Sequence, residues 1–203
     1  MVTGEGVGSR GVIGARRLIA DTDWDRLKVL IGPEEGCPTV PELLTTLIEG
    51  TPPAQARALY DLSEAVNHQD SIVEATAPAM SVIAALLTDP STACVRLPPL
   101  PHRADSASSF RAGLLRLMVS VADGVDHASE AAGRRFGFEP SAATLRVRAI
   151  RPGLFSVVDE LLDDPDPDVR LAAALAALPA LTLPFREDPM PATDEGFADD
   201  PPF

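Results

Sequence analysis

The segment LLDDPDPDVRLAAALAAL, residues 161–178, decides the fold class. Its Asp- and Pro-rich turn lets Asp166 cap a helix whose first position is Pro167. After the turn, small apolar residues recur at helical spacing: Val169, Ala172, Ala173 and Ala176. Before it, a matching apolar stripe is formed by Leu154, Val157, Val158, Leu161 and Leu162. The segment therefore predicts two antiparallel helices joined by a tight turn.

The same organisation recurs along the chain in residues 41–62, 78–95 and 152–178. Each unit opens on a proline, which the first turn of a helix tolerates: Pro41, Pro78 and Pro152. The spacing of equivalent leucines indicates a period of about 37 residues with one degenerate unit between the second and the last. Residues 108–124 are expected to trace that fourth unit, with Ser109 as N-cap and Gly124 as stop. Residues 143–151 alternate like a strand, but their surroundings favour a helix.

Composition agrees with helix-on-helix packing. Hydrophobic residues make up 45% of the 203-residue chain and aromatic residues only 4%, so the core must be built mainly from Leu, Ala and Val. We therefore predict an all-α fold, a short α-solenoid of about four antiparallel helix pairs over residues 21–184. The Gly-rich residues 1–20 are expected to be a flexible segment, and residues 185–203 an acidic, Pro-rich tail.

The charge balance constrains the partners. A formal net charge of −13 disfavours general nucleic-acid binding and favours a basic partner. Cys37 and Cys94 show no C-x-x-C spacing, and the first twenty residues lack the apolar run of a signal peptide, so we expect a cytoplasmic protein. The uncharged stretch of residues 171–185 contains two prolines and is shorter than the roughly 20 residues that span a bilayer, so no membrane segment is expected.

The paired helices and the D-P-x-x-R-x-x-A arrangement of residues 161–178 resemble a HEAT repeat of the phycobilisome-lyase-like type. The segment NHQDSIVEATAPAMSVIAALLTD, residues 67–89, is similar to a stretch in uncharacterised actinobacterial HEAT-repeat proteins, and DWDRLKVLIGP at residues 23–33 fits that group as well. The resemblance covers most of residues 23–181. It implies an α-solenoid that contacts other proteins and carries no fixed catalytic set.

One polar cluster precedes the Pro78 helix: His68, Gln69, Asp70 and Glu74. A histidine beside carboxylates can act as an acid-base group. Adjacent polar residues at a helix-to-helix corner also satisfy free backbone groups, and Thr76 precedes the next helix start. We favour the corner interpretation, with His68 and Gln69 as the polar pair to test.

Other polar groups are interpreted structurally. Asp21, Asp23 and Asp25 flank Trp24 without the bidentate Glu of a calcium loop, so helix capping by Asp23 and a core position for Trp24 are expected. The aspartates of residues 163–168 fit a helix N-terminus, with Arg170 pairing back to one of them. No metal-ligand spacing, nucleophile motif or phosphate loop is found, so no catalytic residue, metal or cofactor is predicted.

One basic concentration stands out in this acidic chain: Arg134, Arg135, Arg146, Arg148 and Arg151, with Phe136 and Phe138 beside them. Arginine with aromatic residues is common at interface hot spots, so these seven residues are candidates for partner binding. The alternative is a solvated helix face whose arginines pair with Asp159 or Glu160.

The sequence thus predicts a non-catalytic protein-binding module: a scaffold, an adaptor or an immunity-like binder of a basic partner. Self-association through the ends of the array is a further alternative. A third is a HEAT-fold enzyme or nucleic-acid module of the DNA-glycosylase or bilin-lyase kind, against which the acidic balance and the single Trp and Tyr argue.

Overall fold

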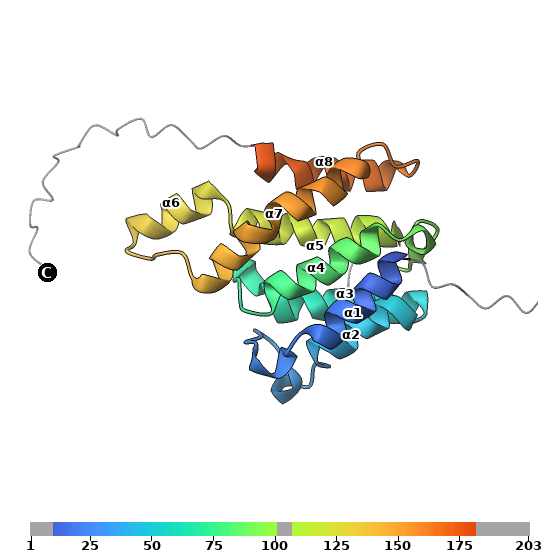
Figure 1. The fold of residues 1–203 in the computed structure, drawn as a ribbon, viewed down its shortest axis with the longest axis horizontal. Coiled ribbons are helices and arrows are strands. Elements are labelled where there is room, and N and C mark those ends of the chain that lie inside the picture. The colour runs from blue at the N-terminus through green and yellow to red at the C-terminus, as the bar shows by residue number, and fades with distance from the viewer. Residues whose placement is uncertain (1–9, 101–106, 182–203) are drawn as a thin grey trace, which may run out of the picture.

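Eight α-helices carry nearly all the regular structure in the computed structural model, which describes residues 10–100 and 107–181 (Figure 1). They are α1 (Arg10–Asp21), α2 (Val40–Glu49), α3 (Pro52–Asn67), α4 (Thr76–Leu87), α5 (Phe110–Gly124), α6 (His127–Arg135), α7 (Ala142–Glu160) and α8 (Pro167–Leu181). Short 3-10 turns lie at η1 (Trp24–Arg26), η2 (Pro33–Glu35), η3 (His68–Asp70) and η4 (Pro90–Thr92). A two-stranded antiparallel ribbon pairs β1 (Arg96–Leu97) with β2 (Ser108–Ser109). The predicted all-α class is confirmed.

The helices pack in two rows. One row runs α1, α4, α7 and the other α3, α5, α8, while α2 packs against α3 and α1 (Figure 1). The core between the rows is aliphatic, as composition predicted, and its largest fully buried side chains include Leu44, Leu62, Met80, Ile83, Leu114, Leu115 and Phe110. Helix α6 projects from one end of the body (Figure 1).

Several helix starts were predicted correctly from local sequence signals. Pro167 begins α8 as predicted, and Thr51 and Pro52 begin α3. Ser109 precedes α5, but the prediction that its side chain caps this helix is wrong: its buried hydroxyl has no hydrogen-bond partner among the described residues. Thr39 forms a capping box with Glu42 at the start of α2. Residues 143–151 are helical, so the helix interpretation of that segment is confirmed.

The prediction that Pro152 opens a helix is wrong. Pro152 lies inside α7, which runs without a break from Ala142 to Glu160. An interior proline cannot donate the backbone hydrogen bond to the residue four positions earlier. The carbonyl without this hydrogen bond is that of Arg148. Pro152 and Gly153 are exposed, so this carbonyl lies toward the outer side of the helix.

Residues 10–20 are not a loose segment, contrary to expectation. They form α1, where Ala15 is fully buried and Val12 and Ile19 pack against the core. A Cβ at Gly11 would lie 2.5 Å from the Ala85 carbonyl oxygen, so this glycine permits close approach of α1 to α4. The expectations for residues 1–9 and for the tail from residue 185 lie outside the described residues.

The predicted fourth unit is also corrected. After α4 the chain forms η4 and the β1–β2 ribbon, and the next helix is α5, which packs beside α4. Residues 108–109 therefore belong to β2, and residues 110–124 form the single helix α5. Within residues 10–100 and 107–181, the consecutive helices that pack together include α2–α3, α4–α5 and α7–α8, and also α1–α2 and α3–α4.

Two smaller expectations are adjusted. Asp23 precedes only the 3-10 turn η1 and makes no side-chain cap; its carboxylate pairs with Arg26 at 3.0 Å. Trp24 does pack against the core, and its indole N–H donates to the Ile19 carbonyl at 2.8 Å. Arg170 donates to the backbone carbonyls of Asp164 and Pro165 instead of pairing with a carboxylate.

None of the described helices is both long and apolar enough to cross a lipid bilayer. Cys37 and Cys94 are free thiols, and burial is the main cause that raises the pKa of Cys37.

Candidate functional site

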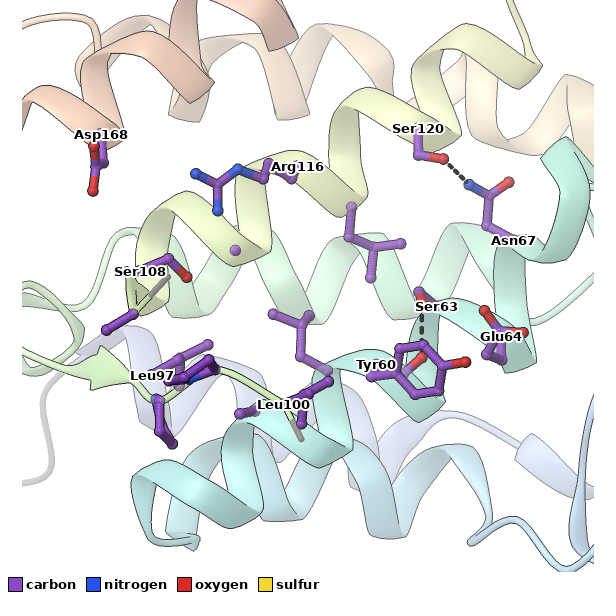
Figure 2. A pocket seen from close by; sticks show the side chains of 17 residues that line it. Tyr60, Ser63, Glu64, Asn67, Leu97, Leu100, Ser108, Arg116, Ser120 and Asp168 are labelled. Atoms are coloured by element: carbon purple, nitrogen blue, oxygen red, sulfur yellow. Dashed lines mark hydrogen bonds between the residues drawn. The ribbon is translucent and has the colours of Figure 1, made fainter. Parts of the chain in front are cut away.

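A groove of about 750 Å³ opens between α3 and α5. This volume lies in the range of ligand-binding clefts. Its apolar walls come from Ala56, Leu59, Leu97, Pro98, Pro99, Leu100, Ala107, Gly113 and Leu117. Its polar lining consists of Tyr60, Ser63, Glu64, Asn67, Ser108, Arg116, Ser120 and Asp168 (Figure 2).

Helical periodicity explains why these polar groups face the groove. On α3, Tyr60, Ser63, Glu64 and Asn67 lie three or four residues apart or adjacent, and so share one face. The other face of α3 carries Leu62, which is fully buried. On α5, Arg116 and Ser120 lie one turn apart, away from the buried Leu114, Leu115 and Met118.

The two helices approach each other closely beside the groove. A Cβ at Gly113 would lie 2.8 Å from Leu59 Cδ2, so the glycine lets α5 approach α3. At one end of the groove the Asn67 side-chain N–H donates to Ser120 Oγ at 2.7 Å (Figure 2). Asn67 is 7% exposed, and its Oδ1 accepts no hydrogen bond from the described residues.

Arg116 is the cationic group of the groove. It is exposed and has no hydrogen bond or ion pair with any residue that the structure describes. Figure 2 shows it on α5, between Asp168 at one end and the Asn67–Ser120 contact at the other. A guanidinium presents five N–H donors in a fixed plane, so Arg116 can bind carbonyl or carboxylate oxygens of a ligand.

Two carboxylates flank this guanidinium. Glu64 Oε2 lies 2.7 Å from His68 Nδ1, and Asp168 Oδ2 lies 3.8 Å from Arg96. Asp168 is about half exposed, so it retains capacity for a cationic ligand group. The groove therefore offers acceptors near its two ends, donors between them and apolar walls.

The predicted polar corner lies where α3 turns into α4. Gln69 and Asp70 adopt positive φ values of 51° and 59°, which the tight reversal requires. His68, the first residue of η3, lies with its Nδ1 2.7 Å from Glu64 Oε2 in the last turn of α3. Glu74 follows in the turn before α4. The corner is closed from inside by Thr76, whose hydroxyl donates to the Val66 carbonyl at 2.6 Å and accepts from the Val73 N–H at 3.1 Å.

The corner also meets an acidic pair at the end of α5. Burial raises the pKa of Asp123, and the neighbouring carboxylates of Asp126 and Asp70 raise it further. No group of three metal-ligating side chains is assembled within the described residues.

The structure divides the predicted arginine cluster. Arg148 is partly buried, pairs with Glu130 and donates to the Val125 carbonyl at 2.8 Å. Arg151 lines a cavity of about 40 Å³ beside Phe155. Arg148 therefore links α7 to α6 and to the end of α5, and neither arginine is fully exposed.

The other members remain on the surface. Phe136 and Phe138 are 78% and 69% exposed. Arg134 pairs with Glu130 at 2.6 Å, while Arg135 and Arg146 have no partner among the described residues. The alternative that these arginines pair with Asp159 or Glu160 is wrong for Arg134 and Arg148, because both form ion pairs with Glu130.

Comparison of the chain with protein-family models, with curated proteins and with solved structures gives no match.

The groove was missed by reasoning from sequence. Its two sides come from residues more than fifty positions apart, such as Asn67 and Ser120. One signal was available: Arg116 and Ser120 place polar groups at i, i+4 on an otherwise apolar helix.

Proposed function

We propose that this protein is a non-catalytic binding module that holds an extended segment of a basic partner protein in the α3–α5 groove. The observation that carries the proposal is the groove itself. It is an open concave surface in which Arg116, a cation without a partner among the described residues, lies between two carboxylates and beside apolar walls. Such a mixture of apolar surface and a few polar groups is typical of binding sites.

The architecture supports this function. We interpret the two rows of helices as a short HEAT-like α-solenoid of three pairs instead of four. Stacked helix pairs create an extended surface along each row, and the groove lies on the α3–α5–α8 row. We propose that the chain is a HEAT-repeat protein.

The chemistry of the partner follows from charge and lining. A net charge of −13 attracts a basic protein from a distance and speeds the encounter. In the groove, Glu64 and Asp168 accept from lysine or arginine side chains of the bound segment. Arg116 donates to its main-chain carbonyls, and Leu97 and Leu100 cover its apolar side chains.

Selection of displayed random peptides tests this proposal with the full chain as bait. We expect basic peptides with apolar residues, whose binding weakens as salt is added. Arg116→Ala should weaken binding by about tenfold or more, because a charge-assisted hydrogen bond is lost. Arg26→Ala is the matched control, since Arg26 is exposed on η1, away from the groove lining. Selection of acidic peptides, or equal affinity of both variants, contradicts the proposal.

Self-association is the second candidate, and a specific observation favours it. Leu171 and Leu175, one turn apart on α8, are 63% and 44% exposed at the end of a row. Light scattering of the full chain and of Leu171→Ser tests it. A dimer that Leu171→Ser dissociates supports self-association, and a monomer at all concentrations removes it.

A further inference from the structure

An exposed apolar stripe on α8 continues the surface of the groove. Asp168 lies in the first turn of α8 and lines the groove. Leu171 and Leu175 follow it by three and seven residues, so they share its face of the helix. Both leucines are exposed, whereas Val169 and Ala173 on the opposite face are fully buried. The stripe of Leu171 and Leu175 therefore lies on the same outer surface as the groove.

Helix α8 packs beside α5, the helix that carries Arg116 (Figure 1). Both helices begin at the β1–β2 ribbon: β2 leads directly into α5, and Arg96 on β1 pairs at 2.9 Å with Asp166, one residue before α8. The axes of packed helices lie about 8–10 Å apart. The stripe is therefore about one helix spacing from Arg116, on the side of α5 away from α3.

Location distinguishes this stripe from the other large apolar side chains that are exposed in the described chain. Those side chains are Ile13, Leu18, Phe136, Phe138 and Leu145. They lie on α1, on α7 and in the segment after α6, and none of these elements lines the groove. A ligand that occupies the groove is thus next to the α8 stripe and not next to the others.

The charge beside the stripe favours a basic ligand. Arg96 lies closer to Asp166, at 2.9 Å, than to Asp168, at 3.8 Å, and the Asp168 side chain is 46% exposed. Arg170 donates to two backbone carbonyls of the preceding turn. Asp168 therefore retains capacity for a ligand cation one helical turn from Leu171. A segment with a basic residue near an apolar one complements both features.

We propose that the partner segment leaves the groove over Arg116 and places an apolar side chain on Leu171 and Leu175, with a basic side chain on Asp168. This inference rests on the function proposed for the groove and extends its binding surface to α8. Two leucines provide far less than the roughly 800 Å² per partner of a standard protein interface, so the stripe fits an extension of the groove better than a dimer interface of its own.

The spacing of the helices determines a spacing in the ligand. An extended segment advances about 3.3 Å per residue, and it crosses about one helix spacing between Arg116 and Leu171. The apolar residue should therefore lie about three positions from the carbonyl that Arg116 binds.

The affinity of basic peptides selected with the full chain tests the inference. Leu171→Ser should weaken their binding by about tenfold, because an apolar contact is lost, and Leu175→Ser should act in the same direction. Leu145→Ser is the matched control, since Leu145 is exposed on α7, outside the groove lining, and should leave the affinity unchanged. Each substituted leucine is exposed, so the variants should keep the helix content of the parent.

A double-mutant cycle identifies the contact itself. An alanine scan of a selected peptide locates the apolar residue whose loss weakens binding most. Replacing that residue should weaken binding less in Leu171→Ser than in the parent chain, because the two side chains contact each other. In Leu145→Ser the same replacement should have its full effect. Equal effects of the replacement in all three chains overturn the inference.

The outcomes also separate this inference from the function on which it rests. If Arg116→Ala weakens peptide binding and Leu171→Ser does not, the groove function stands and the extension to α8 is overturned. If no basic peptide is selected, or if Arg116→Ala binds as well as the parent, the groove function fails and the inference fails with it. A dimer that Leu171→Ser dissociates while peptide affinity stays unchanged assigns the stripe to a second copy of the chain and overturns the inference.

Discussion

Arg111 on α5 and Asp164 in the turn between α7 and α8 form an ion pair at 2.8 Å, with side chains only 12% and 6% exposed. The same guanidinium donates to the Thr92 hydroxyl at 3.0 Å and to the Asp89 carbonyl at 2.9 Å. One side chain therefore links the end of α4, the start of α5 and the turn before α8. It stabilises the packing of α5 against α8.

Arg111→Met is expected to destabilise the fold by about 3–5 kcal/mol, because it leaves the carboxylate of Asp164 buried without its partner. Urea denaturation at neutral pH measures this difference. Arg26→Met is the control, since the Arg26–Asp23 pair is exposed and should contribute under about 1 kcal/mol. Equal losses in the two variants would show that the Arg111 pair has no special role.

Gly11→Ala should loosen α1, because the new Cβ would lie 2.5 Å from the Ala85 carbonyl oxygen and 2.8 Å from Asp89 Cβ. Overpacking of this kind costs about 1–3 kcal/mol. Hydrogen exchange should rise in α1, including at the Val12 N–H that donates to Asp89 at 2.7 Å. Gly14→Ala is the matched control: nothing lies within 4 Å of its Cβ, so alanine should be neutral or stabilise the helix by up to about 1 kcal/mol.

The turn at residues 163–168 was predictable because its signals are local. Asp166 and Pro167 determine the start of α8 through capping and a fixed φ, whatever packs around them. Asp164 and Asp166 also accept from backbone N–H groups two residues ahead, the usual role of Asp in turns.

Features that depend on tertiary contact were not predictable from the same signals. Gly11 was interpreted as a sign of flexibility, yet it permits contact between helices, and only the position of Ala85 distinguishes the two cases. Pro152 was interpreted as a helix start because its neighbours fit one, although α7 continues through it. The groove requires Arg116 and Glu64 to lie on facing helices, which no single helix pattern specifies.

Thr76→Val tests whether the corner after His68 has a structural role. Thr76 is fully buried, and its hydroxyl binds both the Val66 carbonyl and the Val73 N–H. Valine has the same shape but leaves both groups without a partner, so a loss of about 1–3 kcal/mol is expected in thermal or urea denaturation. Thr45→Val is the control, because its hydroxyl only bonds back to Pro41 within α2. A Thr76 variant as stable as the Thr45 variant would argue against this role.

Asp123→Asn should make the protein more stable at neutral pH. Burial first, and then the carboxylates of Asp126 and Asp70, raise the pKa of Asp123 in the folded state, so its ionised form opposes folding. Its favourable contribution is present below the pKa of the unfolded chain and is lost as pH rises through the folded pKa. The gain from asparagine should therefore appear above that range and vanish in acid.

Glu42→Gln provides the opposite sign for the same measurement. Hydrogen bonds from the Thr39 hydroxyl and N–H lower the pKa of Glu42, so its contribution is present above the unfolded pKa and is lost as pH falls through the folded one. This variant should be less stable than the parent at neutral pH and equal to it in acid. Urea denaturation of all three proteins across this pH range compares the two effects. If Asp123→Asn and Glu42→Gln shift stability in the same direction at neutral pH, the opposite environments assigned to the two carboxylates are wrong.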